Sequence, residues 1–441
     1  MHNVMDLVVV GGGAAGLACA LEGCRLGLKV LILEKTDRCG NKVALTGGKR
    51  CNFTHLEPPN LMAKRFDCPK DKILLLLRQF PAQEAIKFFR MLGIEPRIDE
   101  DGCVWVSRKV HRSAGKTESA FMFEINPPDI SRLERAQTGA GIVRERLVEA
   151  VIQAGGEIRT KANVNEVLPG WYIVLKSGET IHARSVVIAT GGASYPQTGS
   201  SGDGNRLVNS LGVKMTPFFP ALAALKPKEE IENFAGISQP SVRVKVDIPN
   251  VAPRPGNFIF AHKYISGSAI MNISGFVARA LMQTDKVGLT VDWVPDKSFQ
   301  ELKAYIDRLR QERPLIQAKT ALTRFVARKF AMFLCVRADV APDSRLTNLS
   351  KVAVQRLIEQ LKGTRFEIVG TEPIERATVT GGGVSLDEVD MRTMAVFRFP
   401  GLFVVGEALD LWAESGGYNL HFAWASGGTA ARAASSALTN K

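Results

Sequence analysis

The stretch from Asp6 to Lys35, DLVVVGGGAAGLACALEGCRLGLKVLILEK, constrains the fold of this 441-residue chain more than any other. Leu7–Val10 is a continuous apolar run, which is typical of a buried parallel strand. Ala14–Leu26 is rich in small and helix-forming residues, and Lys29–Leu33 reads as a second buried strand. Three glycines with G-x-G-x-x-G spacing separate the first strand from the helix: Gly11, Gly13 and Gly16. The pattern predicts a βαβ unit.

Such a unit has a specific chemistry. Its glycines let a pyrophosphate reach backbone amides at the positive end of a helix. An acid about 20 residues further on binds ribose hydroxyls, and Glu34 stands close to that spacing at the end of the second strand. Strand, turn, helix and acid therefore agree on a dinucleotide site. Its expected contacts are Gly11, Gly13, Ala14, Ala15, Gly16, Glu34 and Lys35.

The rest of the chain predicts a discontinuous nucleotide domain. Strands are expected at Glu157–Val167, Trp171–Leu175 and Thr180–Ile188, the last leading into Thr190-Gly191-Gly192. Alternating strands and a basic helical stretch, Phe299–Leu361, follow. Two more apolar strands precede a small-residue helix at the C-terminus. The predicted fold is α/β: a Rossmann-like domain (1–198 and 372–441), a β-barrel-like insertion (199–296 and 362–371) and a small helical insertion (297–361).

The composition limits the kinds of partner and of site that the protein can have. The chain has 57 Lys+Arg against 44 Asp+Glu, a net charge of +13, which attracts polyanions but also fits a plain solvated surface. Its seven cysteines are scattered without a Cys-x-x-Cys pair, which argues against a disulfide framework or a metal site and favours the cytoplasm. No apolar run reaches the roughly 18 residues of a membrane span.

Five motifs, the first of them within Asp6–Lys35, stand in the order and spacing of one family: VVVGGGAAGLACA, LTGGKRCNFTH, ATGGASYPQTGSSGDG, ATVTGGGVSLDEV and GLFVVGEALDLWAESGGYNLHFAWASGGTAA. They resemble the BaiN/RdsA-like family of NAD(P)/FAD-dependent oxidoreductases over nearly the whole chain. The resemblance implies an FAD-binding Rossmann-type domain of the glutathione-reductase type, with a β-barrel-like and a small helical domain. It also implies either dihydrouridine formation in 23S ribosomal RNA or reduction of steroid-like enones.

The resemblance assigns further FAD contacts. The amides of Gly417, Tyr418 and Asn419, at the start of the C-terminal helix, would stabilise the reduced flavin. Gly406 and Glu407 would approach the ribityl–phosphate part. The remaining expected contacts are Gly47, Gly48, Asn52, Val164, Thr190, Gly191, Gly192, Gly416 and Leu420.

Three residues are candidate proton donors for the reduction of a C=C bond, which needs a hydride on one carbon and a proton on the other. Cys51 is the first, and Tyr418 and His421 are alternatives. Packing beside the cofactor explains Cys51 better than catalysis does, and a core or capping role explains Tyr418 and His421 at least as well. His262 stands in a segment that resembles a family motif, but Ala261 and Ser268 replace the usual Thr and Pro, which weakens a catalytic role.

The substrate is the least constrained property. Eight basic residues could contact an RNA backbone: Lys303, Arg308, Arg310, Arg313, Lys319, Arg324, Arg328 and Lys329. Among them, Arg313, Arg324 and Arg328 are predicted to contact the substrate. About thirty residues, Val110–Gly139, depart from the family pattern. Since no second G-x-G-x-x-G opens a helix, NADH or NADPH would bind only transiently as reductant.

Three functions remain open. The first is an FAD-dependent reductase of uridine in ribosomal RNA. The second is a reductase of small enones, which would not need the basic residues. The third is a non-catalytic FAD-holding RNA-binding factor, against which the full set of flavin motifs argues. The oligomeric state and the nucleotide modified are open as well.

Overall fold

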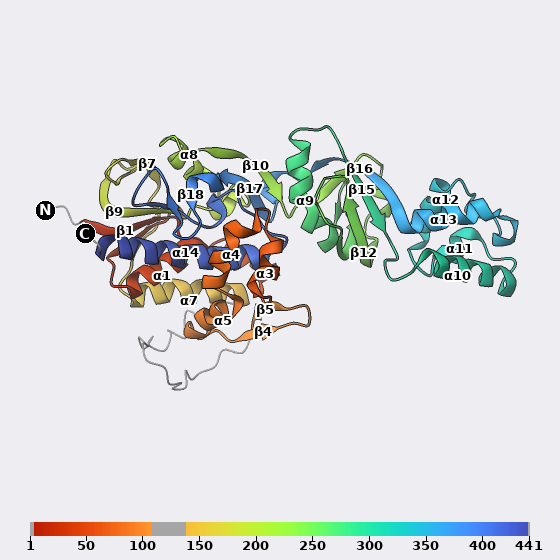
Figure 1. The fold of residues 1–441 in the computed structure, drawn as a ribbon, viewed down its shortest axis with the longest axis horizontal. Coiled ribbons are helices and arrows are strands. Elements are labelled where there is room, and N and C mark those ends of the chain that lie inside the picture. Colours follow the sequence, from red (N-terminus) through yellow and green to blue (C-terminus); the bar gives the residue numbers. More distant parts are fainter. Residues whose placement is uncertain (1–3, 108–137, 440–441) are drawn as a thin grey trace. The chain divides into compact units, whose positions relative to one another are not determined.

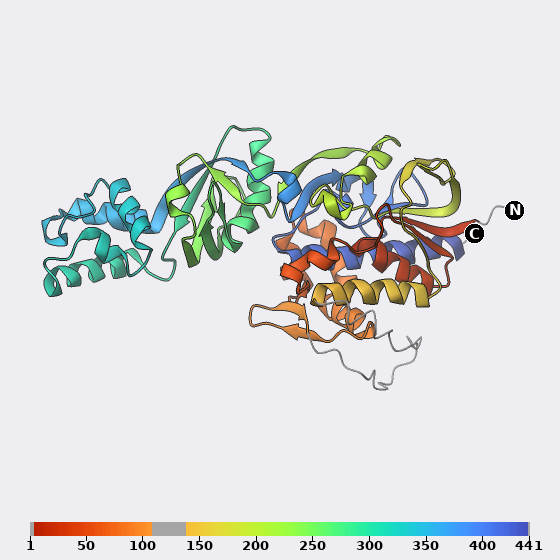
Figure 2. The ribbon, with the colours of Figure 1, turned by 180° about the vertical axis from the view of Figure 1, so that it is seen from behind.

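The computed structural model describes residues 4–107 and 138–439. The chain forms two compact units, one from residues up to Phe218 together with Thr378–Lys441, the other from Phe219–Ala377 (Figures 1 and 2). The first unit therefore uses both ends of the sequence. Most of the segment Val110–Gly139, which departs from the family pattern, lies outside the described residues.

The first unit is built on a mixed sheet with the strand order β18-β19-β20-β9-β1-β2-β6. Its parallel strands are β1 (Met5–Val10), β2 (Val30–Leu33), β6 (Glu157–Arg159), β9 (Thr180–Ile188) and β20 (Leu402–Val404). Antiparallel strands β18 (Val389–Asp390) and β19 (Ala395–Val396) extend one edge, and the hairpin β7 (Val164–Leu168) and β8 (Tyr172–Leu175) joins β9.

Strand β1 lies between β2 and β9 and is parallel to both. The order of the strands reverses at this point, and ligands of open α/β sheets bind outside the carboxyl ends of the strands there. In this sheet those ends are Val10 and Ile188. All four residues of β2 are buried, as a strand covered on both faces requires.

Two long helices lie side by side against the sheet: α1 (Ala14–Arg25) and the C-terminal α14 (Gly416–Thr439) (Figures 1 and 2). They approach closely because Gly427 carries no side chain; a Cβ there would lie 2.3 Å from the Ala15 carbonyl oxygen. A third helix, α7 (Gly139–Gln153), also packs on α1. The small residues of the C-terminus thus hold the end of the chain against its beginning.

Smaller elements complete this unit. One is a three-stranded sheet of β3 (Asn52–His55), β5 (Cys103–Val106) and β4 (Pro96–Ile98). The helices are α2 (Thr46–Lys49), α3 (Pro59–Met62), α4 (Lys70–Gln79), α5 (Ala82–Met91) and α8 (Asp203–Asn209). Strand β10 (Met215–Ala221) pairs with β17 (Val379–Val384).

The second unit contains a closed barrel with the order β11-β14-β13-β12-β15-β16. The strands are β11 (Leu225–Pro227), β12 (Ser238–Val246), β13 (Arg254–Phe260), β14 (Ile265–Ser266), β15 (Val287–Asp292) and β16 (Thr364–Thr371). Buried and partly exposed residues alternate along β15, because one face of each strand points into the barrel. Helix α9 (Ser268–Leu281) packs on β12 and β13.

Between β15 and β16 the chain forms four helices: α10 (Phe299–Glu312), α11 (Ala318–Leu322), α12 (Arg328–Arg337) and α13 (Lys351–Gly363). Ser298 and Glu301 form a capping box at the start of α10. The predicted fold class, a Rossmann-like domain with inserted barrel and small helical parts, is confirmed.

One predicted strand is wrong. Glu157–Val167 is not continuous but splits into β6 and β7. Lys161 has a φ of 56°, and the Lys161 and Ala162 amides donate to the Thr36 and Glu34 carbonyls. This turn places Ala162, Asn163 and Val164 in the wall of the pocket described below.

Candidate functional site

A pocket opens at the carboxyl ends of β1 and β9, where the strand order reverses. Gly11, at the end of β1, has a φ of +103°, a value that favours glycine. Gly13 differs: a Cβ there would meet a single protein atom within 4 Å, the Ala189 carbonyl oxygen at 3.9 Å. Protein packing therefore does not require a glycine at position 13. The space in front of the helix fits a pyrophosphate on the α1 amides.

The acid at the end of β2 is held in place. Glu34 is buried, accepts a hydrogen bond from the Gly12 amide at 2.9 Å, and accepts two from Thr36 at 2.8 Å. A carboxylate has about four acceptor positions, so one remains for a ribose hydroxyl. Beside it, Lys35 forms an ion pair with Asp203 at 2.7 Å, and both residues line the pocket.

The pocket continues past the phosphate turn. Fourteen of the predicted cofactor contacts line it: Gly11, Gly13, Ala14, Ala15, Glu34, Lys35, Val164, Thr190, Gly191, Gly406, Glu407, Gly416, Asn419 and Leu420. Thr190 also has a buried hydroxyl oxygen with no hydrogen-bond partner in the described part of the chain. A pocket lined by the glycine turn, the buried acid Glu34 and the start of α14 fits FAD.

The remaining predicted contacts do not line the pocket: Gly16, Gly47, Gly48, Asn52, Gly192, Gly417 and Tyr418. At several of these positions the packing of the protein itself explains the residue type. A Cβ on Gly47 would lie 2.7 Å from the Trp105 ring, and one on Gly192 would lie 2.4 Å from Thr380. Their direct contact with the cofactor stays a prediction.

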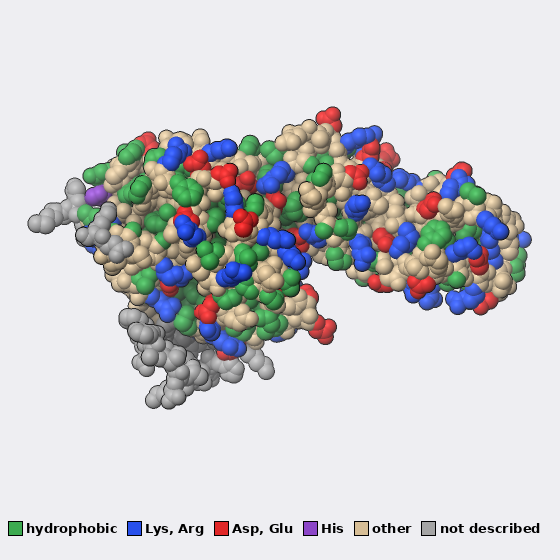
Figure 3. Space-filling view, in the orientation of Figure 1, with side chains coloured by type: hydrophobic (Ala, Val, Ile, Leu, Met, Phe, Trp, Pro, Cys, Tyr) green, Lys and Arg blue, Asp and Glu red, His purple; other side chains and the backbone are tan. Residues whose placement is uncertain are grey.

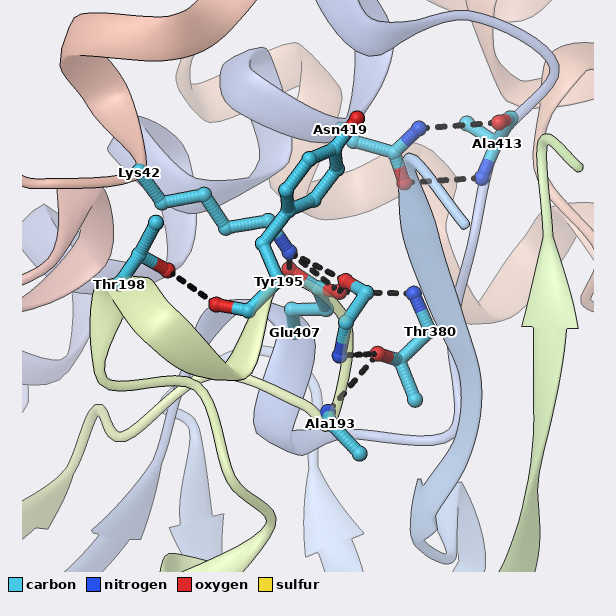
Figure 4. Close-up of polar contacts among 9 residues, drawn as sticks. Lys42, Ala193, Tyr195, Thr198, Thr380, Glu407, Ala413 and Asn419 are labelled. Atoms are coloured by element: carbon cyan, nitrogen blue, oxygen red, sulfur yellow. Dashed lines mark hydrogen bonds and ion pairs between the residues drawn. The ribbon is translucent and has the colours of Figure 1, made fainter. Parts of the chain in front are cut away.

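The start of α14 forms the far end of the pocket. Asn419 closes the preceding turn: its side chain donates to the Ala413 and Ser415 carbonyls at 2.9 and 2.8 Å and accepts from the Ala413 amide (Figure 4). The amides of Gly417, Tyr418 and Asn419 donate to Ser415 at 3.2–3.3 Å. To bind the flavin as predicted, these amides would have to exchange their long hydrogen bonds to Ser415 for hydrogen bonds to the cofactor.

Gly416 and Gly417 have different neighbours. A Cβ on Gly416 would meet nothing within 4 Å, whereas one on Gly417 would lie 2.7 Å from the Asn52 carboxamide. Gly416 lines the pocket. Gly416 thus faces open space in the pocket, whereas Gly417 is required by its contact with Asn52.

The three candidate proton donors are buried, and none lines the pocket. The Cys51 amide donates to the carbonyl of Thr46 at 3.1 Å, and Thr46 lines the pocket. Burial raises the pKa of the Cys51 thiol to about 12. Tyr418 stacks on His55 with ring centroids 4.0 Å apart, and burial raises the pKa of its hydroxyl.

His421 is completely enclosed. Its Nδ1 lies 2.8 Å from the Thr54 hydroxyl and its Nε2 lies 2.9 Å from the Phe80 carbonyl oxygen, so both ring nitrogens have partners. Burial lowers its pKa to about 4. His262, in contrast, is exposed in the turn between β13 and β14.

Residues outside the predicted set complete the pocket wall. Lys42, Val43 and Thr46 come from the segment after β2, and Thr198, Gly199 and Ser200 come from the loop after β9. Lys42 forms an ion pair with Glu407 at 2.8 Å (Figure 4). The sequence offered little reason to select Lys42, because this lysine before LTGGKRCN belongs to no motif and to no periodic pattern.

The eight basic residues of the helical part are not equivalent. Four are engaged within the protein: Lys303 and Arg308 pair with Asp307 and Glu312, Arg310 donates to two carbonyls, and Lys319 pairs with Asp343. Four are exposed and form no side-chain hydrogen bond or ion pair in the described part of the chain: Arg313, Arg324, Arg328 and Lys329. Figure 3 shows acidic side chains interspersed with basic ones on the visible face of this part.

Residues 4–107 and 138–439 contain no cluster of three or more His, Cys, Asp or Glu side chains that could hold a metal ion. Among the helices of the same residues, none combines the length and apolar character needed to cross a membrane. The seven cysteines are all free thiols.

The sequence matches the model of the HI0933-like protein Rossmann domain family over residues 5–117 and 128–433. It is 26% identical over 430 residues to a ribosomal RNA dihydrouridine synthase of Haemophilus influenzae, covering 97% of each chain. It is equally 26% identical over 430 residues to a 3-dehydro-bile acid delta(4,6)-reductase of Clostridium scindens, covering 97% of this chain and 98% of that one.

A solved structure has a similar fold. The 3-ketosteroid delta1-dehydrogenase of Sterolibacterium denitrificans superimposes with a TM-score of 0.51 at 14% identity, covering 99% of this chain and 100% of that one. The family match spans most of the sequence, and the pocket fits the cofactor that the motifs predicted. The chain belongs to the HI0933-like Rossmann-domain family and is an FAD-dependent oxidoreductase.

Proposed function

We propose that this protein reduces the C5=C6 bond of a uridine in 23S ribosomal RNA to give dihydrouridine. The observation that carries the proposal is the similarity, over 97% of the chain, to a ribosomal RNA dihydrouridine synthase. The net charge of +13 and the four exposed basic residues that form no ion pair in the described part of the chain support an anionic polymer as substrate. We infer that an enzyme acting on such a substrate works in the cytoplasm.

When bound, FAD supplies a hydride to one carbon of the activated double bond. The protein's part is to hold the cofactor, orient the base and provide a proton for the other carbon. A uridine within a folded RNA must leave its stack to reach the pocket. NADH or NADPH would restore the reduced cofactor, and would bind weakly because the sequence contains one dinucleotide motif.

We propose Cys51 as the proton donor; its backbone amide is bonded to Thr46, a residue of the pocket wall. Burial raises the pKa of the Cys51 thiol to about 12, so the thiol carries its proton at neutral pH. So weak an acid would donate only to a strongly basic atom, such as the carbon next to the carbonyl after hydride has added to the other carbon. Cys51→Ala should lower turnover by a factor of roughly 10² to 10⁴ with FAD content unchanged. Cys335→Ala, at a buried thiol of the other unit, is the matched control. Equal turnover of both variants would remove Cys51 from this role.

The decisive experiment maps dihydrouridine in ribosomal RNA from cells with and without the gene, and again after complementation with a Gly13→Val variant that cannot hold FAD. We expect one position to lose its dihydrouridine in the deletion and to regain it only with the wild-type protein. Unchanged dihydrouridine at every position would overturn the proposal.

A second function has a specific observation in its favour. The bile acid delta(4,6)-reductase is as similar to this chain as the RNA enzyme is, over the same length. Reduction of a steroid-like enone would need the same FAD pocket but not the exposed arginines. Turnover of a 3-keto-4-ene steroid by the purified protein, with no change in ribosomal RNA, would favour this alternative. FAD binding without turnover of either substrate would instead indicate a non-catalytic FAD-holding factor.

A further inference from the structure

Helix α10 carries an aromatic ring that is set between two arginines. Tyr305 is partly exposed, and the guanidinium carbons of Arg308 and Arg324 lie 5.9 and 5.7 Å from the centre of its ring. The ring of Phe325 packs edge-on against it at a centroid distance of 5.1 Å. A guanidinium at such a distance from an aromatic ring is attracted to it. These four residues of α10 and of the loop after α11 form the Tyr305 cluster.

The Tyr305 cluster is held in place by hydrogen bonds to the backbone. The Tyr305 hydroxyl donates to the carbonyl of Ala321 at 3.4 Å, which connects α10 to α11. The Phe325 amide donates to the Leu322 carbonyl at 2.9 Å, and the Phe325 carbonyl accepts from the Gln239 side chain at 2.9 Å. The ring is therefore ordered before a ligand arrives, so that stacking on it costs less entropy.

The charges around the ring are mainly positive. Arg324 is exposed and forms no ion pair in the described part of the chain, and the exposed Arg328 and Lys329 follow it closely in the sequence. Arg308 pairs with Glu312 at 4.0 Å, but the two side chains are 61% and 59% exposed. Such a pair is weak in water and leaves the Arg308 guanidinium available to an anionic ligand.

A nucleic acid with unpaired bases matches both properties of the Tyr305 cluster. Unpaired bases stack on aromatic side chains and on arginine planes, and the phosphates between them attract cations. A duplex keeps the faces of its bases stacked on one another, so it would use the cations but not the ring. The combination of a partly exposed ring with surplus positive charge therefore fits single-stranded RNA better than duplex RNA.

We propose that the Tyr305 cluster binds an unpaired nucleobase of the RNA substrate, with the base stacked on Tyr305 and the adjoining phosphates on Arg308 and Arg324. The inference rests on the proposed function, because that function supplies the RNA. It goes beyond it by assigning a base-binding site to the second unit, whereas the residues that line the FAD pocket belong to the first.

The test measures the affinity of the purified FAD-loaded protein for a short single-stranded oligouridine RNA and for an abasic RNA of the same length, at several salt concentrations. The wild type should bind the oligouridine more tightly. Tyr305→Leu should lower the affinity for oligouridine roughly five- to a hundredfold, with its salt dependence and its affinity for the abasic RNA unchanged. Tyr305→Phe keeps the ring and should match the wild type.

Two further variants separate stacking from charge. Arg324→Gln should weaken the binding of both RNAs and flatten the dependence of log affinity on log salt concentration by about 0.7, the value for one phosphate of a single strand. Tyr172→Leu is the matched control, because Tyr172 is a 44% exposed tyrosine of the first unit that stacks on His182. This variant should bind both RNAs as the wild type does.

Equal affinity of the wild type for the oligouridine and the abasic RNA would overturn the proposal, and this comparison needs no variant to fold. Equal losses in Tyr305→Leu and Tyr172→Leu, with both variants folded by thermal unfolding, would overturn it as well. Dihydrouridine that depends on the gene, together with oligouridine binding that does not depend on Tyr305, would refute this inference alone. Dihydrouridine that is unchanged in the deletion would refute only the proposed function, since the binding measurements use purified protein.

Discussion

Burial determines what individual side chains of this enzyme can do. His421 was a candidate acid from its place three residues after Tyr418, but its two ring nitrogens bond to Thr54 and Phe80, deep in the core. His55 lies beside it in the same region, with its Nε2 3.0 Å from the Ser415 hydroxyl. Both are neutral, well-partnered core histidines at pH 7. Their burial predicts a contribution to the stability of the protein, and the catalytic role of His421 stays a prediction.

This burial predicts acid sensitivity. Desolvation lowers the pKa values of His55 and His421 to about 4. At His55 the carboxylates of Glu57 and Asp101 partly raise the pKa again, and the Arg65 guanidinium lowers it further. The unfolded chain therefore binds protons at these histidines, below about pH 6.5, that the folded chain does not. Their contribution to stability is complete above pH 6.5 and is lost as the pH falls toward 4, on the order of 3 kcal/mol each.

Urea unfolding at pH 7.5 and pH 5 tests this sign. His421→Gln should be less stable than the wild type at pH 7.5 but should lose less stability on acidification, by on the order of 2 kcal/mol. His182→Gln, on the half-buried face of β9, serves as control and should follow the wild type. A parallel pH dependence in all three proteins would contradict the argument.

At the scale of elements, helix α14 joins the core to the cofactor site. Two adjacent glycines of α14, Gly427 and Gly428, differ in whether they contact α1. A Cβ on Gly427 would lie 2.3 Å from the backbone oxygen of Ala15, whereas one on Gly428 would meet only the flexible end of Arg432, at 3.3 Å.

Gly427→Ala should therefore destabilise the protein by about 1–3 kcal/mol, because α1 and α14 must move apart. Gly428→Ala should be neutral or stabilise by up to about 1 kcal/mol, because alanine favours the helix. Thermal unfolding of both variants checks this. A loss of stability in Gly428→Ala as large as in Gly427→Ala would show that helix contact is not the cause.

The start of the same helix predicts a separation of folding from binding. Gly416→Ala places its methyl group in the open pocket, so FAD affinity should fall about tenfold or more while the apoprotein keeps its melting temperature. Gly417→Ala instead pushes against the Asn52 carboxamide and should lower the melting temperature. FAD titration and thermal unfolding of the two apoproteins distinguish these effects, and identical behaviour would refute the assignment.

At the scale of the whole molecule, charge decides between the two proposed substrates. Each phosphate contact steepens the dependence of log affinity on log salt concentration by roughly 0.7 to 0.9. Changing Arg313, Arg324 and Arg328 to Glu should weaken RNA binding and flatten that slope by about 2 to 3, without loss of FAD. A small apolar substrate would show almost no slope.

A matched control changes the net charge equally at exposed basic residues on the barrel: Lys226, Arg243 and Lys245 to Glu. RNA affinity against salt is measured for the wild type and both triple variants. The control should keep most of the slope. Equal losses in both variants would mean that only total charge matters, and flat plots for all three would favour the enone reductase.

The sequence by itself determined the parts of this protein that rest on local pattern. The strand, glycine turn, helix and acid from Met5 to Glu34 could be predicted because backbone conformation and phosphate binding there depend on residues close in the chain. Only the tertiary structure decided which side chains meet across the chain. It joined Lys42 to Glu407, 365 positions apart, and enclosed Cys51, Tyr418 and His421, because burial and ion pairing depend on neighbours that no local period or spacing records.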